Sequence, residues 1–97
     1  MRHFYRSHLQ PTAALAAADQ FFPALGLQAG ASSARSRMYA GPLGAMKLAA
    51  HSEGGNYTFI EVETNQVGES RLDRNVKKFF VTLHRGAEPQ HQPEASY

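Results

Sequence analysis

One apolar stripe near the C-terminus constrains the fold more than any other feature of this sequence. Five apolar residues recur at spacings of i, i+4, i+7, i+8 and i+11, which places them on one side of an α-helix: Leu72, Val76, Phe79, Phe80 and Leu83. Ser70 and Asp73 match the spacing of a capping box, so the helix is predicted to begin at Ser70 and to stop at Gly86. Such a stripe is stable only when it is buried, so the rest of the chain must cover it.

A strand directly upstream supplies part of that cover. Residues 57–64 alternate in character and follow a turn, Glu53-Gly54-Gly55-Asn56. One face carries Thr58, Ile60 and Val62, which suit a core, while the other carries Tyr57, Phe59, Glu61 and Glu63. Two further strands, 34–40 and 45–52, flank a Gly41-Pro42-Leu43-Gly44 turn and complete a predicted meander.

The N-terminal third is predicted to contain a strand and a helix. Residues 2–9 include β-compatible bulk, and Gln10-Pro11-Thr12 interrupts the strand. Thr12 is predicted to cap an Ala-rich helix that continues through Phe22 and ends at Pro23. The small, polar stretch 26–33 is predicted to be a loop.

These elements predict an α+β domain with one antiparallel sheet of about four strands and two helices on one face. Residues 1–86 are expected to form a single domain, since the whole chain has only 97 residues. Residues 87–97 are rich in Pro, Gln and Glu without periodicity and are expected to be a disordered tail.

Composition excludes several classes. The sequence has no cysteine, which excludes disulfide frameworks, thiolate zinc sites and thiol nucleophiles. No apolar run approaches the roughly 20 residues of a membrane span, and the N-terminus does not have the pattern of a secretory signal, so we expect a cytoplasmic protein.

The order of elements resembles a shortened version of the helix-grip fold of START and Bet v 1-like proteins, the polyketide cyclase and lipid-transport group. The resemblance rests on the early strand followed by Pro11-Thr12, on the Gly54-Gly55 hairpin, and on the long helix that ends with Phe79-Phe80 to Leu83. It implies a last helix laid along the sheet with apolar ligands enclosed between them. That family has more strands than this chain and no shared catalytic motif, so the resemblance assigns no catalytic residue here.

The second face of the predicted strand 57–64 is the main candidate for binding. Tyr57 and Phe59, with Tyr39 or Met46 beside them, would leave an apolar face that two helices cannot also cover. Pairing two copies removes such a face from water, so we expect a homodimer or larger symmetric assembly. Glu61 and Glu63 would then lie at the rim.

Glu61 and Glu63 also allow a different interpretation. Carboxylates at i and i+2 share a strand face and, if buried, raise one another's pKa, which suits acid/base chemistry. The ordinary explanation is a pair of exposed carboxylates opposite Lys47 or Arg37. The histidines show no metal-ligand spacing, because His3 and His8 fall on opposite faces of a strand, so no metal site is predicted.

Four basic residues mark the solvent side of the last helix and could meet phosphates: Arg71, Arg74, Lys77 and Lys78. Charged outer faces are normal on helices, so a nucleic-acid partner is not the favoured prediction. Gly54-Gly55 and Gly41 to Gly44 belong to hairpin turns, and the sequence has no glycine-rich nucleotide-binding signature, so no cofactor is predicted.

The leading functional hypothesis is a small, non-enzymatic binding or assembly module that takes a small apolar ligand or a protein partner. Two alternatives remain: a cyclase-like enzyme that uses Glu61 or Glu63, and a nucleic-acid accessory protein that uses the last helix.

Overall fold

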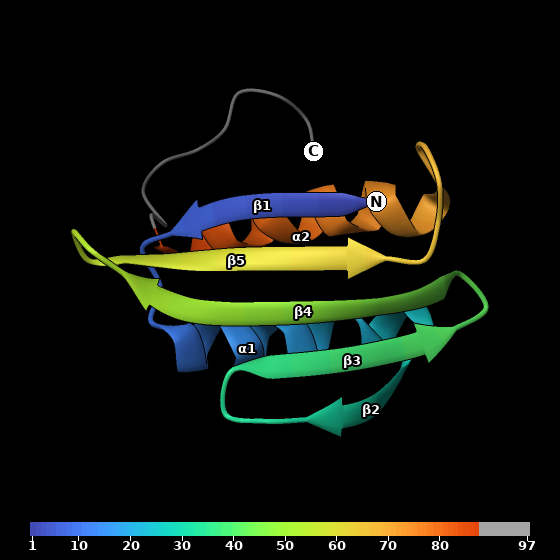
Figure 1. Ribbon diagram of the computed structural model, residues 1–97, viewed down its shortest axis with the longest axis horizontal. Helices are drawn as coiled ribbons and strands as arrows, with labels where there is room; N and C mark the ends of the chain where they lie inside the picture. Colours follow the sequence, from blue (N-terminus) through green and yellow to red (C-terminus); the bar gives the residue numbers. More distant parts are fainter. Residues whose placement is uncertain (88–97) are drawn as a thin grey trace.

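A single antiparallel sheet organises the molecule, and the computed structural model describes residues 1–87 of the chain. Its strands lie in the order β1-β5-β4-β3-β2 and comprise β1 (Arg2–Ser7), β2 (Gln28–Ser32), β3 (Ser36–Gly41), β4 (Gly44–Glu53) and β5 (Tyr57–Thr64). The helices are α1 (Pro11–Phe21), the short 3₁₀ helix η1 (Pro23–Leu25) and α2 (Arg71–Ala87). Figure 1 shows α1 and α2 behind the same face of the sheet. The α+β prediction is confirmed, with five strands where about four were expected.

Strand β2 is the element that the sequence did not predict. It lies inside the stretch 26–33 that was expected to be a loop, and it pairs with β3 through Gln28 opposite Ala40 and Ala29 opposite Tyr39. All five of its residues are exposed, and most are small. Small residues give little strand signal, so this edge strand is held by backbone pairing with β3 and not by its own side chains.

Most boundaries differ by one or two residues from those predicted, and three of them have a visible physical cause or consequence. Strand β1 ends at Ser7, whose Oγ accepts a hydrogen bond from the Leu9 backbone N–H at 3.1 Å. Helix α1 begins at Pro11, so the prediction that Thr12 caps it is wrong. Proline fits the first helical position because its fixed φ is already helical and its missing N–H would have had no partner there. Helix α2 passes through Gly86 to Ala87, and the predicted tail otherwise lies outside the described residues.

The core fills the space between the helices and the sheet. Both α-helices, β3, β4, β5 and the connection between α1 and β2 contribute fifteen buried apolar side chains: Ala14, Leu15, Ala18, Phe22, Leu27, Tyr39, Met46, Leu48, Ala50, Ile60, Val62, Leu72, Val76, Phe79 and Leu83. Four of the five predicted stripe residues of α2 belong to this set. Phe80 is the exception, because it lies at the border of the stripe and stacks, half-buried, on Tyr5 with ring centroids 5.0 Å apart.

Strand β5 shows the predicted alternation. Thr58, Ile60 and Val62 are buried against the helices. The turn before it places Gly55 at φ 78° and Asn56 at φ 65°, in the left-handed region that these two residue types enter most readily. The sequence therefore fixes both the hairpin and the face that β5 turns to the core.

A buried carboxylate joins β1, β5 and α2. Asp73 is 1% exposed, and its Oδ1 lies 2.7 Å from His3 Nε2 and accepts a hydrogen bond from the Thr64 hydroxyl at 2.8 Å. The Ser70 hydroxyl donates to Oδ2 at 2.5 Å and accepts from the Asp73 backbone N–H at 3.0 Å, which confirms Ser70 as the helix cap, although the Asp73 carboxylate binds the Ser70 hydroxyl where a full capping box would use the backbone N–H. Burial raises the pKa of Asp73, but hydrogen bonds from Ser70, His3 and Thr64 outweigh it and hold the pKa below its ordinary value.

None of the helices formed by residues 1–87 is long and apolar enough to cross a membrane. The cytoplasmic location stays a prediction.

Candidate functional site

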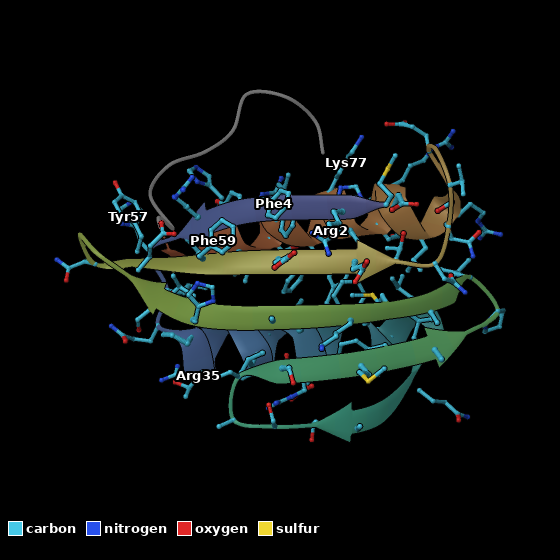
Figure 2. All side chains as sticks on the ribbon, in the orientation of Figure 1. Arg2, Phe4, Arg35, Tyr57, Phe59 and Lys77 are labelled. Atoms are coloured by element: carbon cyan, nitrogen blue, oxygen red, sulfur yellow. The ribbon has the colours of Figure 1, made fainter. Side chains whose placement is uncertain are left out.

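The sheet face opposite the helices, called here the outer face, is the candidate site. No element among residues 1–87 covers it, and Figure 2 looks directly onto it, with Arg2, Phe4 and Phe59 in front of the ribbon and both helices behind. Its large apolar side chains are exposed: Phe4 by 55%, Met38 by 44% and Tyr57 by 38%. Large exposed apolar side chains on an uncovered sheet face are the feature that makes this face the candidate site.

Three aromatic side chains, Phe4, Tyr57 and Phe59, form what we call the aromatic ridge. It runs over β1 and β5, where the Phe4 and Phe59 rings stack with centroids 5.7 Å apart. His51 of β4 contacts the other side of Phe59 at 5.4 Å, and the Arg6 guanidinium lies over the Phe59 ring at the same distance. Phe4 and Phe59 therefore form a stacked aromatic pair with a cation over one of its rings, and Tyr57 lies two residues before Phe59 on the same face.

Charged side chains surround the ridge in balanced numbers. The outward positions of β1, β4 and β5 carry three basic residues, Arg2, Arg6 and Lys47, and three acidic ones, Glu53, Glu61 and Glu63. They form pairs within the chain: Arg2 lies 3.7 Å from Glu61 and 3.6 Å from Glu63, and Arg6 lies 2.7 Å from Glu53. Lys47 stands opposite Glu63 in the β4–β5 register. The net charge of this face is zero, while the whole chain carries +2.

Glu61 and Glu63 share the outer face, as predicted. Both carboxylates form ion pairs with Arg2, and the side chains of Glu61 and Glu63 are 35% and 57% exposed. They line a shallow polar hollow of about 220 Å³ with Arg2, Lys47 and Ala49. Acid/base catalysis by a carboxylate is favoured by burial in an apolar pocket, and these two lie on an open, ion-paired surface.

A second hollow, the end groove, lies where β3 and β4 meet at their hairpin. It measures about 550 Å³, and its outward-facing lining comes from small or flexible side chains: Gln28, Met38, Ala40, Ala45 and Glu63. The Ala40–Ala45 pair forms its floor, because these residues stand opposite each other in the register. The outer face thus combines a ridge at one end with a groove at the other.

Tyr39 and Met46 were predicted to extend the aromatic face, and this prediction is wrong. They are 1% and 3% exposed and point toward the helices. The register explains it, since Tyr39 pairs with Met46 and Met46 pairs with Thr64, which is on the buried side of β5. Arg37 also lies on this side and binds Asp19 of α1 at 3.0 Å, so it does not face Glu61 or Glu63.

The four basic residues of α2 are all exposed, as expected: Arg71, Arg74, Lys77 and Lys78. Because α2 lies behind the sheet, they do not belong to the outer face (Figure 2). Lys77 forms an ion pair with Glu69, which neutralises part of this surface. Within the described chain no three His, Asp or Glu side chains are grouped so as to hold a metal ion.

Sequence analysis missed Phe4, Arg6 and His51 as members of the candidate site. They reach it because β1 pairs with β5 and β4 pairs with β5 on its other side, which places Arg6 and His51 on either side of Phe59. The alternation of exposed Arg2, Phe4 and Arg6 along β1 was the available signal, but nothing local indicates that β1 lies next to β5.

No model of a known protein family matches the chain, and no curated protein sequence matches it significantly. The resemblance to helix-grip proteins therefore stays a prediction.

Proposed function

We propose that this chain is a non-enzymatic assembly module that pairs with a second copy of itself through the outer face. The observation that carries the proposal is the exposure of Phe4, Met38 and Tyr57 on one continuous, uncovered sheet face. Large apolar side chains left in water on an uncovered sheet face favour association. A two-fold axis brings the same patch of two copies together and removes both from water.

The charge pattern supports a second copy over a highly charged partner. Three basic and three acidic side chains leave the outer face neutral, so two such faces can approach without net repulsion. A polyanion such as nucleic acid would meet the carboxylates Glu53, Glu61 and Glu63 here. The basic residues of α2 lie elsewhere and are partly neutralised by Glu69.

The packed interior also supports a surface function. The space between helices and sheet is occupied by Phe22, Leu48, Ile60 and Phe79, each fully buried. A small apolar ligand would therefore have to bind at the surface, and the end groove of the outer face, where the proposed interface also lies, is one such place.

Sedimentation velocity at micromolar concentration tests the proposal. We expect a dimer for the wild type and a monomer for Phe59→Glu, because dimerisation would have to remove the new carboxylate at the centre of the aromatic ridge from water. Phe4→Glu, on the edge strand, provides a second disruption that is less coupled to packing.

The matched control is Val67→Glu. Val67 is 95% exposed in the loop after β5, so the same change there should leave the dimer intact. Urea unfolding of each variant shows whether it is still folded. A wild-type protein that sediments as a monomer at these concentrations would overturn the proposal.

A further inference from the structure

Helix α2 turns a row of basic side chains away from the sheet. Arg71, Arg74 and Lys78 are exposed and follow one another at spacings of three and four residues, and Arg85 continues the row seven residues later. Spacings of three, four and seven keep side chains on one side of a helix. At a rise of ~1.5 Å per residue, this basic row is about 21 Å long.

Carboxylates do not neutralise the basic row. Each of the six in residues 1–87 has a partner elsewhere: Asp19 with Arg37, Glu53 with Arg6, Glu61 and Glu63 with Arg2, Glu69 with Lys77, and Asp73 with His3. Arg71, Arg74 and Lys78 form no ion pair with a described residue. Residues 1–87 hold ten basic and six acidic side chains, and residues 69–87 alone hold five basic and two acidic ones. Three of the four net positive charges therefore belong to this one segment.

The basic row opposes the stability of the helix that carries it. Its neighbouring members are like charges at i, i+3 and i+4, where repulsion destabilises a helix. Arg71 and Arg74 also lie at the N-terminal end of α2, where the positive end of the helix dipole disfavours cations. Local rules of this kind are broken mainly at functional sites.

We infer that the basic row binds the phosphate backbone of a nucleic-acid duplex. The inference does not rest on the proposed function, because α2 lies behind the sheet, away from the outer face (Figure 1). Bound phosphates offset the repulsion within the row, and guanidinium groups bind phosphate oxygens in pairs. One strand of a duplex carries a phosphate about every 3.4 Å of its axis, so a row of about 21 Å spans roughly six of them.

The apolar residues of α2 favour a duplex over two other polyanions. Proteins that bind single strands stack bases on aromatic rings, but Phe79 is buried and Phe80 stacks on Tyr5. A helix that binds a membrane surface buries its apolar face in the lipid, and the apolar stripe of α2 already packs in the core. Phosphate contacts alone position a duplex without reading its sequence, so we expect binding without sequence preference.

Charge reversal separates a binding role of the row from a structural one. Arg74→Glu turns two repulsions within the row into attractions, to Arg71 and Lys78, and suits the N-terminal end of the helix. Its urea midpoint should therefore equal or exceed that of the wild type. Its affinity for a fluorescent duplex of about 20 base pairs, measured by anisotropy in about 50 mM salt, should fall at least about tenfold. Lys78→Glu is a second variant that should also lose affinity.

The matched control is Arg35→Glu. Arg35 is exposed, forms no ion pair with a described residue, and lies near the β2–β3 edge of the sheet, whereas α2 lies behind the β1 edge (Figure 2). It changes the net charge by as much as Arg74→Glu does, yet it should bind the duplex nearly as tightly as the wild type. For the wild type, log Kd should rise with log salt with a slope of about 3, and Arg74→Glu should lower that slope by at least about one.

Four results would overturn the inference. The first is a wild type that does not bind the duplex, or binds it without dependence on salt. The second is an equal loss of affinity in Arg35→Glu, which would mean that net charge alone matters. The third is tighter binding to a single strand of the same sequence, or to phosphatidylserine vesicles. The fourth is a lower urea midpoint for both Arg74→Glu and Lys78→Glu, which would give the row a structural role.

Discussion

Removing the buried carboxylate of Asp73 should be among the most destabilising single changes in this protein. In Asp73→Ala, the side chains of His3 and Thr64 remain in the interior without their acceptor, which lies 2.7 and 2.8 Å away in the wild type. A buried polar group left without its hydrogen-bond partner costs about 1–3 kcal/mol, and two such groups lose Asp73 here. Water can reach part-buried Ser70, so we expect a loss of about 3–4 kcal/mol.

The assay is urea unfolding of wild type and Asp73→Ala at neutral pH, compared by midpoint. Glu69→Ala is the matched control, because Glu69 lies one turn away, is exposed, and pairs with Lys77 at the surface. The Glu69→Ala change should leave the free energy of unfolding nearly unchanged. If the two variants shift the midpoint equally, the buried network does not hold β1 against α2.

Acid provides a second and independent readout. Because hydrogen bonds hold the folded-state pKa of Asp73 below its unfolded value, its stabilising contribution is complete above the unfolded pKa, about 3.9. That contribution is lost as the pH falls through the folded pKa. Wild-type stability should therefore fall more steeply below about pH 4 than that of Asp73→Asn, which cannot ionise. Parallel curves for the two proteins would refute the assigned pKa shift.

Two further predictions concern the core. Phe79→Ala should lower the free energy of unfolding by about 3–5 kcal/mol, since the ring is fully buried against Phe21 and Phe22. Half-buried Phe80→Ala should lower it by about 1–2 kcal/mol, and exposed Lys77→Ala should leave it nearly unchanged. Equal urea midpoints for the three variants would contradict the assigned stripe. Burial and the Asp19 carboxylate raise the pKa of the Tyr39 hydroxyl, so its contribution is present below the unfolded pKa of about 10 and is lost as the pH rises. As the pH rises above about 10, the stability of the wild type should therefore fall more steeply than that of Tyr39→Phe. Equal pH dependence of the two proteins would count against the raised pKa.

The elements with strong local patterns could be predicted from the sequence. The stripe of α2 repeats with helical spacing, and the β5 alternation determines which side of that strand is buried. The Gly-containing turns on either side of β4 define both hairpins. In each case the information lies within about a dozen residues, so no knowledge of the distant chain is needed.

The predictions that failed concern features that depend on pairing between distant segments. In β4, Ala45 and Ala49 face outward while Met46 and Leu48 face inward, so apolar residues occupy both sides and the pattern does not reveal the buried face. That ambiguity produced the wrong placement of Met46. The contact between His3 and Asp73 requires β1 to lie beside β5 and over α2, which no local pattern encodes.

The pairing of the first strand with the last has a consequence for how the chain acquires its structure. Strands β2 to β5 follow one another through short connections and can pair as they leave the ribosome, with small entropic cost for each closure. Strand β1 cannot pair early, because its partner strand β5, where Glu63 stands opposite Arg2, is synthesised about sixty residues later. We expect β1 to dock in a late step that slows folding, since contacts between distant segments form slowly. Until then the inward side of β5 beside β1 stays open, and α2 lacks part of the surface that it packs on.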